Sequence, residues 1–298
     1  RLMDLILHLA IVVAIYSIFA LSLNIEVGYT GLFNFGHVAF FAIGAYASAL
    51  LSLHGVPFFS ALIAGIACAA MGGLLIGLPA LKLEGDYFGI ATLGFAEIVR
   101  MLLQNQVAWT KGPMGLPGIP KPAILSWHFD TLPAYLLLAL GAAALTFLVI
   151  GFLTLSPFGR VLKAIRDDET AATVLGKNPF AYKMASFMIG SAFAGLAGVL
   201  WAHFITFVSP GDFTLTETIL VLLIVVLGGK GTLWGPVAGA AVLIFFQESV
   251  RFLRLPPEWS GILGPLQQMV FGLLLVVLMI FRPDGLIREK GKETIDRD

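Results

Sequence analysis

Residues 156–183 read SPFGRVLKAIRDDETAATVLGKNPFAYK, a charged stretch between two long apolar runs. Its basic residues are Arg160, Lys163, Arg166, Lys177 and Lys183. Acidic residues at positions 167–169 offset part of this charge. Charged side chains are costly in the hydrocarbon of a bilayer, whereas long apolar runs can cross it. The pattern therefore predicts a water-exposed loop between two membrane spans.

Helix signals within this stretch predict two short helices. Ser156 is a favourable N-cap, and a proline follows it at the first helical position, where its missing N–H has no partner to lose. We expect this first helix to run to about Arg166. Asp167 or Asp168 can cap the second helix, and Gly176 suits a left-handed C-terminal stop.

The composition of the 298-residue chain is that of an integral membrane protein, because 58% of its residues are hydrophobic and only 12% are charged. Soluble domains carry about 25% charged residues. The formal net charge is zero, so no nucleic-acid partner is indicated. The single cysteine, Cys68, excludes an intramolecular disulfide and a thiolate metal cluster. The sequence has no G-x-x-x-x-G-K-[ST] phosphate loop, so ATP that drives this chain would be bound by another subunit.

Apolar runs mark the expected membrane spans. They lie at about 5–23, 31–53, 58–78, 87–103, 133–155, 184–208 and 261–281, with shorter apolar segments at 216–227 and 237–246. Small residues between 191 and 198 predict close helix contact. Lysine and arginine are concentrated in the loop 156–183 and the tail 282–298, which places both in the cytoplasm and the polar loop 104–131 outside. No regular helix is expected at 110–122, where glycine and proline are frequent.

Two glycine-rich segments interrupt apolar runs in a similar way. Both read G-x-x-G and then G-x-V-A, at 28–39 and at 228–238. Residues 24–28 are expected to end the first span, and the run 31–53 to be a discontinuous helix that begins inside the protein. Matched breaks in two halves of a transporter indicate a translocation path at a repeat interface, with coincidence in a glycine-rich chain as the alternative. The candidate path residues are Gly28, Gly31, Asn34, Gly36, His37, Gly228, Gly229, Gly231 and Gly235.

A few ionisable residues lie at membrane depth. Glu97 and Arg100 are three residues apart and share a helix face near the end of a span. We interpret them as a mutually satisfied pair rather than as a substrate contact. His37 and His203 are isolated, and a lone histidine is more often a hydrogen-bonded core residue than a ligand. No spacing of His, Glu and Cys resembles a metal site.

The loop 159–176 has the pattern G-R-x-x-x-A-I-R-x-D-E-x-A-A-x-x-x-G, which resembles the EAA loop of ABC importer permeases. Further stretches resemble branched-chain amino acid ABC permeases of the LivM type: GYTGLFNFGHVAFFAIGAYASALL (28–51), LEGDYFGIATLGFAEIVRMLLQN (83–105), GPMGLPGIP (112–120) and VLGGKGTLWGPVAGA (226–240). The likeness covers nearly the whole chain. It implies one permease domain over 1–298, an all-α polytopic membrane bundle of about 8–10 segments with broken or re-entrant helices.

The resemblance also implies partners and roles. The ATPase-docking residues would be Gly159, Arg160, Arg166, Asp168, Glu169, Ala171, Ala172 and Gly176. A LivH-type sister permease, two cytoplasmic ATP-binding subunits and an extracytoplasmic amino-acid-binding protein would complete an importer in the inner membrane of a bacterium or archaeon. No cofactor is expected in this chain, since ATP and Mg²⁺ would bind the partner subunits. The chain itself would not be an enzyme.

Other functions remain open at this stage. Importers of urea and short amides are close relatives of the LivM type. An ion-coupled secondary transporter could use Glu97, Arg100 or His203, and transport by this chain alone in an ion gradient would favour it. A membrane enzyme or scaffold is the third alternative, although the sequence offers no metal or nucleophile constellation for an enzyme.

Overall fold

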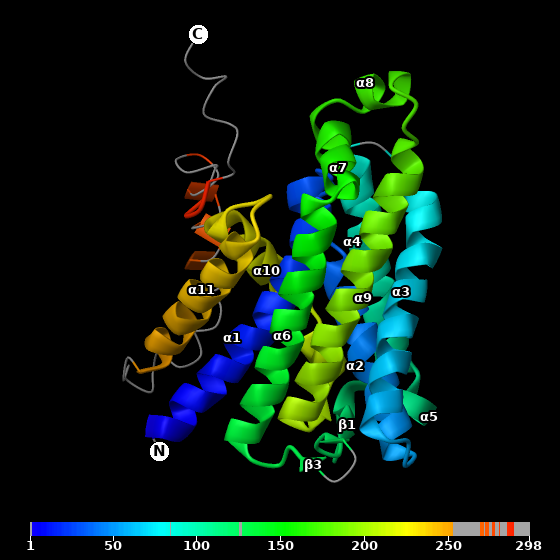
Figure 1. Ribbon diagram of the computed structural model, residues 1–298. Coiled ribbons are helices and arrows are strands. Elements are labelled where there is room, and N and C mark those ends of the chain that lie inside the picture. Colours follow the sequence, from blue (N-terminus) through cyan, green and yellow to red (C-terminus); the bar gives the residue numbers. More distant parts are fainter. Residues whose placement is uncertain are drawn as a thin grey trace.

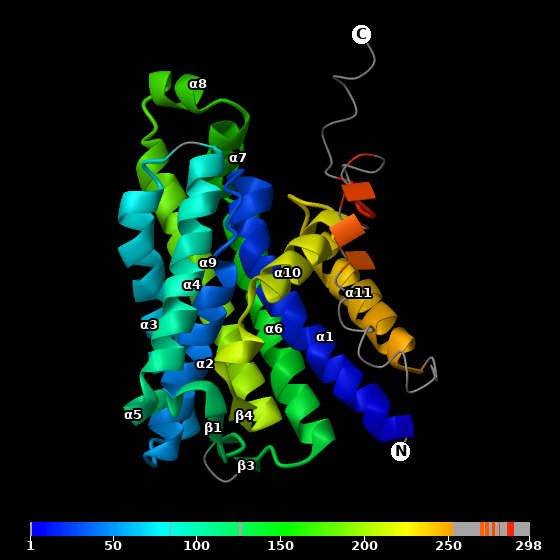
Figure 2. The same ribbon diagram turned by 180° about the vertical axis from the view of Figure 1, so that it is seen from behind.

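The computed structural model describes residues 2–83, 85–124 and 127–252, together with 269–270, 272–273, 276–277, 280 and 285–288. In these residues the fold is a bundle of long helices, as the sequence predicts (Figure 1). The predicted span 261–281 and the tail 282–298 lie largely outside the described residues. Two short helices project from one end of the bundle, and the N-terminus of the first helix lies at the other (Figures 1 and 2).

The long helices follow the predicted apolar runs. They are α1 (Leu2–Asn24), α2 (His37–Leu53), α3 (Phe58–Ala80), α4 (Asp86–Asn105), α6 (Leu132–Leu155), α9 (Pro179–Ile205), α10 (Leu215–Gly228) and α11 (Trp234–Phe252). Five segments among the described residues are long and apolar enough to cross a membrane: Met3–Tyr29, Phe58–Ala80, Leu132–Leu155, Pro179–Ile205 and Pro210–Gly228.

Two of these helices are short. α2 has 17 residues, and at about 1.5 Å per residue it does not reach the roughly 30 Å of bilayer hydrocarbon. α10 has 14 residues and reaches a spanning length only together with the residues before it, as the segment Pro210–Gly228. The first residue of α2, His37, is fully buried, so this helix begins inside the protein, as predicted from the run 31–53.

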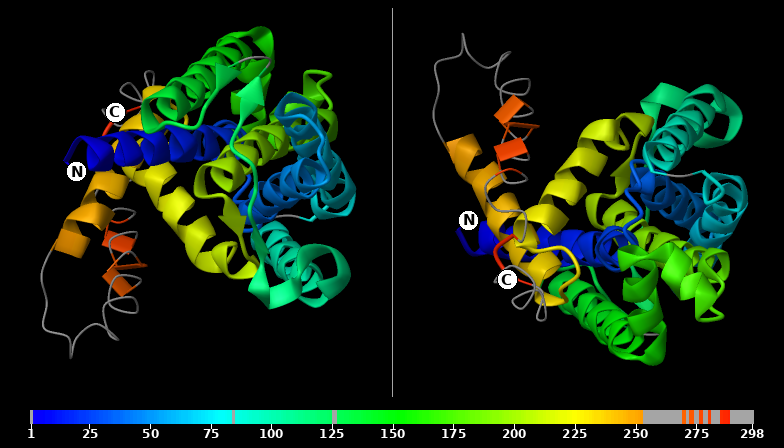
Figure 3. Two further views of the ribbon diagram at one scale, coloured as in Figure 1. Left: turned by 90° about the horizontal axis from the view of Figure 1, so that it is seen from below. Right: turned by 90° about the horizontal axis from the view of Figure 1, so that it is seen from above.

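Helix α9 lies at the centre of the bundle, where it contacts α1, α2 and α3. A Cβ added at Gly198 would lie 2.0 Å from the carbonyl oxygen of Phe41 in α2. A Cβ added at Gly195 would lie 2.4 Å from the Cβ of Ala69 in α3. Helix backbones approach this closely only where side chains are absent. The predicted close-contact face of α9 is therefore confirmed. On the other side of the bundle, α1 contacts both α9 and α11, and so lies between α11 and the group formed by α2, α3 and α9 (Figure 3).

The end of α1 differs from the prediction. Residues 24–28 do not end the helix: α1 continues into a π-helical turn, η1 (Ile25–Tyr29), and the chain leaves helical geometry only after it. The polar side chain of Asn24 stays within the helix because it bonds across to a distant loop, at Thr232. A rule that reads polar residues as helix breaks misses such long-range partners.

The start of α9 also differs, since it begins at Pro179 rather than near 184. Asn178 caps this start by accepting a hydrogen bond from the N–H of Ala181 at 3.2 Å. The first turns of α9 carry Tyr182 and Lys183, which read as loop residues in the sequence. A helix that leaves the membrane can keep such side chains in water, so the apolar run underestimates its length.

The opposite end of the bundle holds the loop 104–131. It contains α5 (Val107–Thr110), a 3₁₀ turn η2 (Gly112–Met114) and the short strands β1 (Leu116–Pro117), β2 (Ala123–Ile124) and β3 (Trp127–His128), where β2 pairs with β3. β1 pairs antiparallel with β4 (Phe207–Val208) after α9, and η3 (Pro210–Asp212) follows. Beyond the last residue of α5, the segment 110–122 contains no α-helix, as predicted.

Candidate functional site

The loop 156–183, named the docking loop after its predicted role, forms the two predicted helices, α7 (Pro157–Asp167) and α8 (Glu169–Val174). Ser156 Oγ accepts a hydrogen bond from the N–H of Phe158 at 3.2 Å, and Asp168 Oδ1 accepts from the N–H of Ala171 at 2.9 Å. Gly176 follows α8 with φ +76°, the left-handed conformation expected of a glycine stop. Both caps and the stop are confirmed, and the loop projects beyond the spans (Figure 1).

The residues predicted to dock an ATPase do not all face solvent. The exposed ones are Arg160, Asp168, Glu169, Ala171 and Gly176. Gly159 and Ala172 are buried and hold the loop together instead. A Cβ at Gly159 would lie 2.1 Å from the carbonyl oxygen of Thr154, so glycine is required at the tight corner between α6 and α7.

Sequence reasoning missed an apolar tip on the docking loop. Val174 and Leu175, at the end of α8, are 82% and 77% exposed. They lie between the paired alanines and the glycine stop. The presence of two large apolar residues in a short helix predicted to lie in water is the sequence signal that could have identified them. Together with the exposed Ala171, they give this end of the loop an exposed apolar surface.

The two glycine-rich breaks meet in space. Asn24 Nδ2 donates to the carbonyl oxygen of Thr232 at 2.7 Å, and the N–H of Gly231 donates to Asn24 Oδ1 at 2.9 Å. A Cβ at Gly28 would lie 2.3 Å from the nitrogen of Gly231, so the two segments are in backbone contact. Of the predicted path residues, Gly28 and Gly231 are therefore brought together, whereas Gly31 faces Arg166 and Gly36 faces Thr92. Whether the two halves are structural repeats stays a prediction.

The second break is built from close backbone contacts. A Cβ at Gly228 would lie 1.9 Å from the carbonyl oxygen of Gly235, which shows how tightly the start of α11 folds back onto the end of α10. Gly229 and Gly231 both have positive φ, 120° and 76°. Glycine is therefore needed here for conformation as well as for space.

A polar cluster is buried beside the first break. Ser22, Glu26, Asn34 and His37, the buried polar cluster, have no exposed surface. Asn34 Nδ2 donates to Glu26 Oε2 at 2.7 Å, and His37 Nδ1 lies 3.4 Å from Glu26 Oε1. His37 Nε2 lies 2.8 Å from Ser22 Oγ. These contacts join η1, the loop that follows it and the start of α2.

The hydrogen bonds orient the Ser22–His37 contact. Ser22 donates its hydroxyl proton to the carbonyl oxygen of Phe19, at 2.7 Å, so its oxygen is left to accept from His37 Nε2. The other ring nitrogen, Nδ1, faces Glu26 Oε1 and the side-chain amide of Asn34. Each of the four buried side chains therefore has polar neighbours inside the protein.

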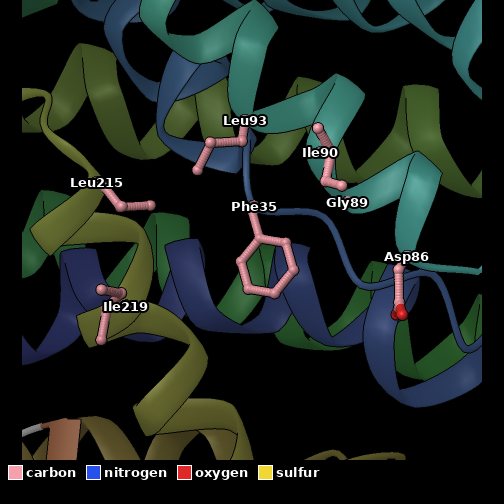
Figure 4. A pocket seen from close by; sticks show the side chains of 7 residues that line it. All are labelled: Phe35, Asp86, Gly89, Ile90, Leu93, Leu215 and Ile219. Atoms are coloured by element: carbon pink, nitrogen blue, oxygen red, sulfur yellow. The ribbon is translucent and has the colours of Figure 1, made fainter.

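An open, mainly apolar pocket of about 380 Å³ lies next to the same break (Figure 4). Its lining comes from α4, α10 and the segment before α2: Phe35, Asp86, Gly89, Ile90, Leu93, Leu215 and Ile219. Phe35 points into it, and its N–H donates to Thr92 Oγ1 of α4 at 3.2 Å. The apolar lining of this pocket suits an aliphatic group. Asp86, the one charged residue of the lining, lies at the edge of the pocket.

The other ionisable candidates have partners within the protein, although His203 Nε2 is buried without a hydrogen-bond partner among the described residues. Arg100 Nε donates to Glu97 Oε2 at 2.9 Å, and a second contact joins the same two groups, which confirms them as a pair. His203 Nδ1 lies 2.7 Å from the carbonyl oxygen of Pro120, so it ties α9 to the loop 104–131. In the described residues, no three His, Cys, Asp or Glu side chains are placed to hold a metal.

These features define a class of protein. Helices long enough to cross a membrane, two discontinuous helices that meet inside the bundle and a projecting polar loop are the architecture of a multi-pass membrane permease. The chain belongs to the family described as branched-chain amino acid transport system / permease component, which matches residues 5–279.

Individual relatives agree with this family. The chain is 40% identical to the high-affinity branched-chain amino acid transport system permease protein LivM of Escherichia coli, over 94% of this chain and 69% of that protein. It is 29% identical to the probable LivM of Methanocaldococcus jannaschii, over 96% and 94%. It is also 26% identical to the permease protein LivH of E. coli, over 94% and 93%. No solved structure matches the chain.

Proposed function

We propose that this chain is the permease subunit of an ATP-driven importer of branched-chain amino acids. It forms the translocation path with a LivH-type sister permease, receives its substrate from an extracytoplasmic binding protein and is driven by two cytoplasmic ATP-binding subunits. The observation that carries the proposal is α8, a capped helix with an exposed apolar tip that projects from the bundle and bears the EAA-like pattern. Substrate choice rests on the relatives named LivM and LivH.

The structure favours a path for a substrate with an aliphatic side chain. The pocket beside the first break is lined mainly by apolar side chains, which suit a branched hydrocarbon group better than urea. The glycine breaks supply free backbone groups for the charged ends of an amino acid. An ion-coupled mechanism is less well supported, because Glu97 and Arg100 neutralise each other.

Reconstitution tests this function. The chain is co-expressed with its neighbouring transport subunits, purified as a complex and placed in vesicles that contain ATP. We expect uptake of labelled leucine, isoleucine or valine that needs ATP and the binding protein, and that excess urea does not inhibit. Uptake by the chain alone in an ion gradient, or uptake of urea instead, would contradict the proposal.

The apolar tip gives a first mutational prediction. Replacing Leu175 with aspartate is expected to reduce co-purification of the ATP-binding subunits about tenfold. The exposed leucine side chain would be buried when the partner docks, whereas an aspartate at the same position would place an unfavourable charge in the interface. Lys177→Ala is the matched control, since this exposed side chain lies just beyond α8. Unchanged recovery of the ATP-binding subunits with Leu175→Asp would exclude docking at the tip.

A further inference from the structure

One face of α7 does not point towards solvent but holds the first glycine break. Arg166 Nη1 donates a hydrogen bond to the carbonyl oxygen of Gly28 at 2.7 Å. One turn earlier, Lys163 Nζ lies 5.1 Å from the centre of the Tyr29 ring. Residues three apart share a helix face, so both cations of α7 contact η1 from the same side.

The end of η1 is chemically suited to this contact. The last carbonyl groups of a helix lack partners within the helix and carry its negative dipole end, which favours a cation. Asp167 Oδ1 accepts from Arg166 Nε at 3.0 Å, which orients the guanidinium while Nη1 bonds to Gly28. A cation that donates to a backbone carbonyl forms a stronger bond than a neutral donor.

Glycine at position 31 makes room for the same side chain. Gly31 has φ +72°, and a Cβ added there would lie 3.1 Å from Arg166 Cγ. Both glycines of the first G-x-x-G pattern thus contribute: Gly28 supplies the acceptor, and Gly31 lets the arginine stem approach. The pattern predicted a break in the helix, whereas its contact with α7 is visible only in three dimensions.

The turn that Arg166 holds is also the point where the two breaks meet. Gly28 is in backbone contact with Gly231, and Asn24, one turn earlier, bonds to the N–H of Gly231 and the carbonyl oxygen of Thr232 within the second break. η1 also contains Glu26 of the buried polar cluster. A shift of α7 therefore reaches both discontinuous helices through one hydrogen-bonded turn.

We propose that Arg166 and Lys163 are positioning residues that transmit movement of the docking loop to both glycine breaks through η1. This inference rests on the proposed function, since the movement of α7 is driven by partner ATPases. It separates two roles within one loop. Exposed residues such as Arg160 and Leu175 face the partner, whereas the inward face of α7 acts on the translocation path.

The test uses the complete transporter in vesicles, with the substrate-loaded binding protein. For Arg166→Ala we expect normal recovery of the ATP-binding subunits and normal basal ATP hydrolysis, but about tenfold less substrate imported per ATP, because the loss of one charged hydrogen bond is worth about this factor. Arg166→Lys restores part of the coupling, since lysine keeps the charge but not the planar fork. Lys177→Ala, which removes the same charge from the exposed part of the loop, leaves the ratio unchanged.

Three results would overturn parts of this account, and each has its own meaning. Normal import per ATP in Arg166→Ala removes the positioning role and leaves the proposed function intact. Loss of the ATP-binding subunits from the same variant shows that Arg166 docks the partner and also removes the positioning role. Absence of ATP-driven import in the unaltered complex removes the proposed function and this inference with it.

Discussion

Replacing Gly198 with valine is expected to prevent stable folding of the bundle. A Cβ at this position would lie 2.0 Å from the carbonyl oxygen of Phe41 and 3.1 Å from the nitrogen of Ala45, both backbone atoms of α2. A flexible side chain can move aside, but helix backbone cannot without separating α9 from α2. Overpacking of a core costs about 1–3 kcal/mol, and a backbone clash lies at or above the upper end of this range.

The measurement is the thermal unfolding of the purified protein in detergent, together with its size-exclusion profile. For Gly198→Val we expect aggregation, or a fall in unfolding temperature of about 10 °C. Gly141→Val is the matched control, because no atom lies within 4 Å of a Cβ added there in α6. If Gly198→Val unfolds at the same temperature as Gly141→Val, the close α2–α9 contact is not present.

Local signals in the sequence predicted the local parts of this structure. Ser156, Asp168 and Gly176 act as caps and stop because their roles depend only on the adjacent backbone. The apolar runs predicted most long helices because the length and apolarity of a continuous run are enough to indicate a membrane helix. The glycine pattern at 28–36 predicted that a helix begins inside the protein, since such backbone needs special conformations and close contacts.

Long-range polar contacts were the part that sequence could not supply. Asn24 reads as a helix-breaking residue until its partners at Gly231 and Thr232, far along the chain, are known. Arg166 fits the EAA-like pattern as a docking residue, yet its side chain turns towards Gly28. His37 is a hydrogen-bonded core histidine, as interpreted from the sequence, but its partners Glu26 and Ser22 are visible only in three dimensions. Each of these contacts joins residues that no periodicity relates.

Replacing His37 with leucine is expected to destabilise the protein by about 3–5 kcal/mol, the cost of removing one partner from a buried ionisable pair. Glu26 would then keep its bond from Asn34 but lose its only ionisable neighbour in the buried polar cluster. Its Oε1 already lacks a hydrogen-bond partner among the described residues, and a Cβ at Gly190 would lie only 2.2 Å from it. Helix α9 already lies close against Glu26, so little space is left for the protein to rearrange around an unpaired carboxylate.

A double-mutant cycle separates the charge effect from the loss of packing. Glu26→Gln keeps the shape and the oxygen that accepts from Asn34, so in the double variant with His37→Leu no buried charge remains. We expect the double variant to regain at least half of the unfolding free energy that His37→Leu loses, while His54→Leu, at an exposed turn, changes it little. If the double variant were as unstable as His37→Leu alone, packing and not charge would account for the cluster. Because Glu26 is part of η1, recovery in this cycle would show that its pairing with His37 holds the turn between α7 and the two breaks in place.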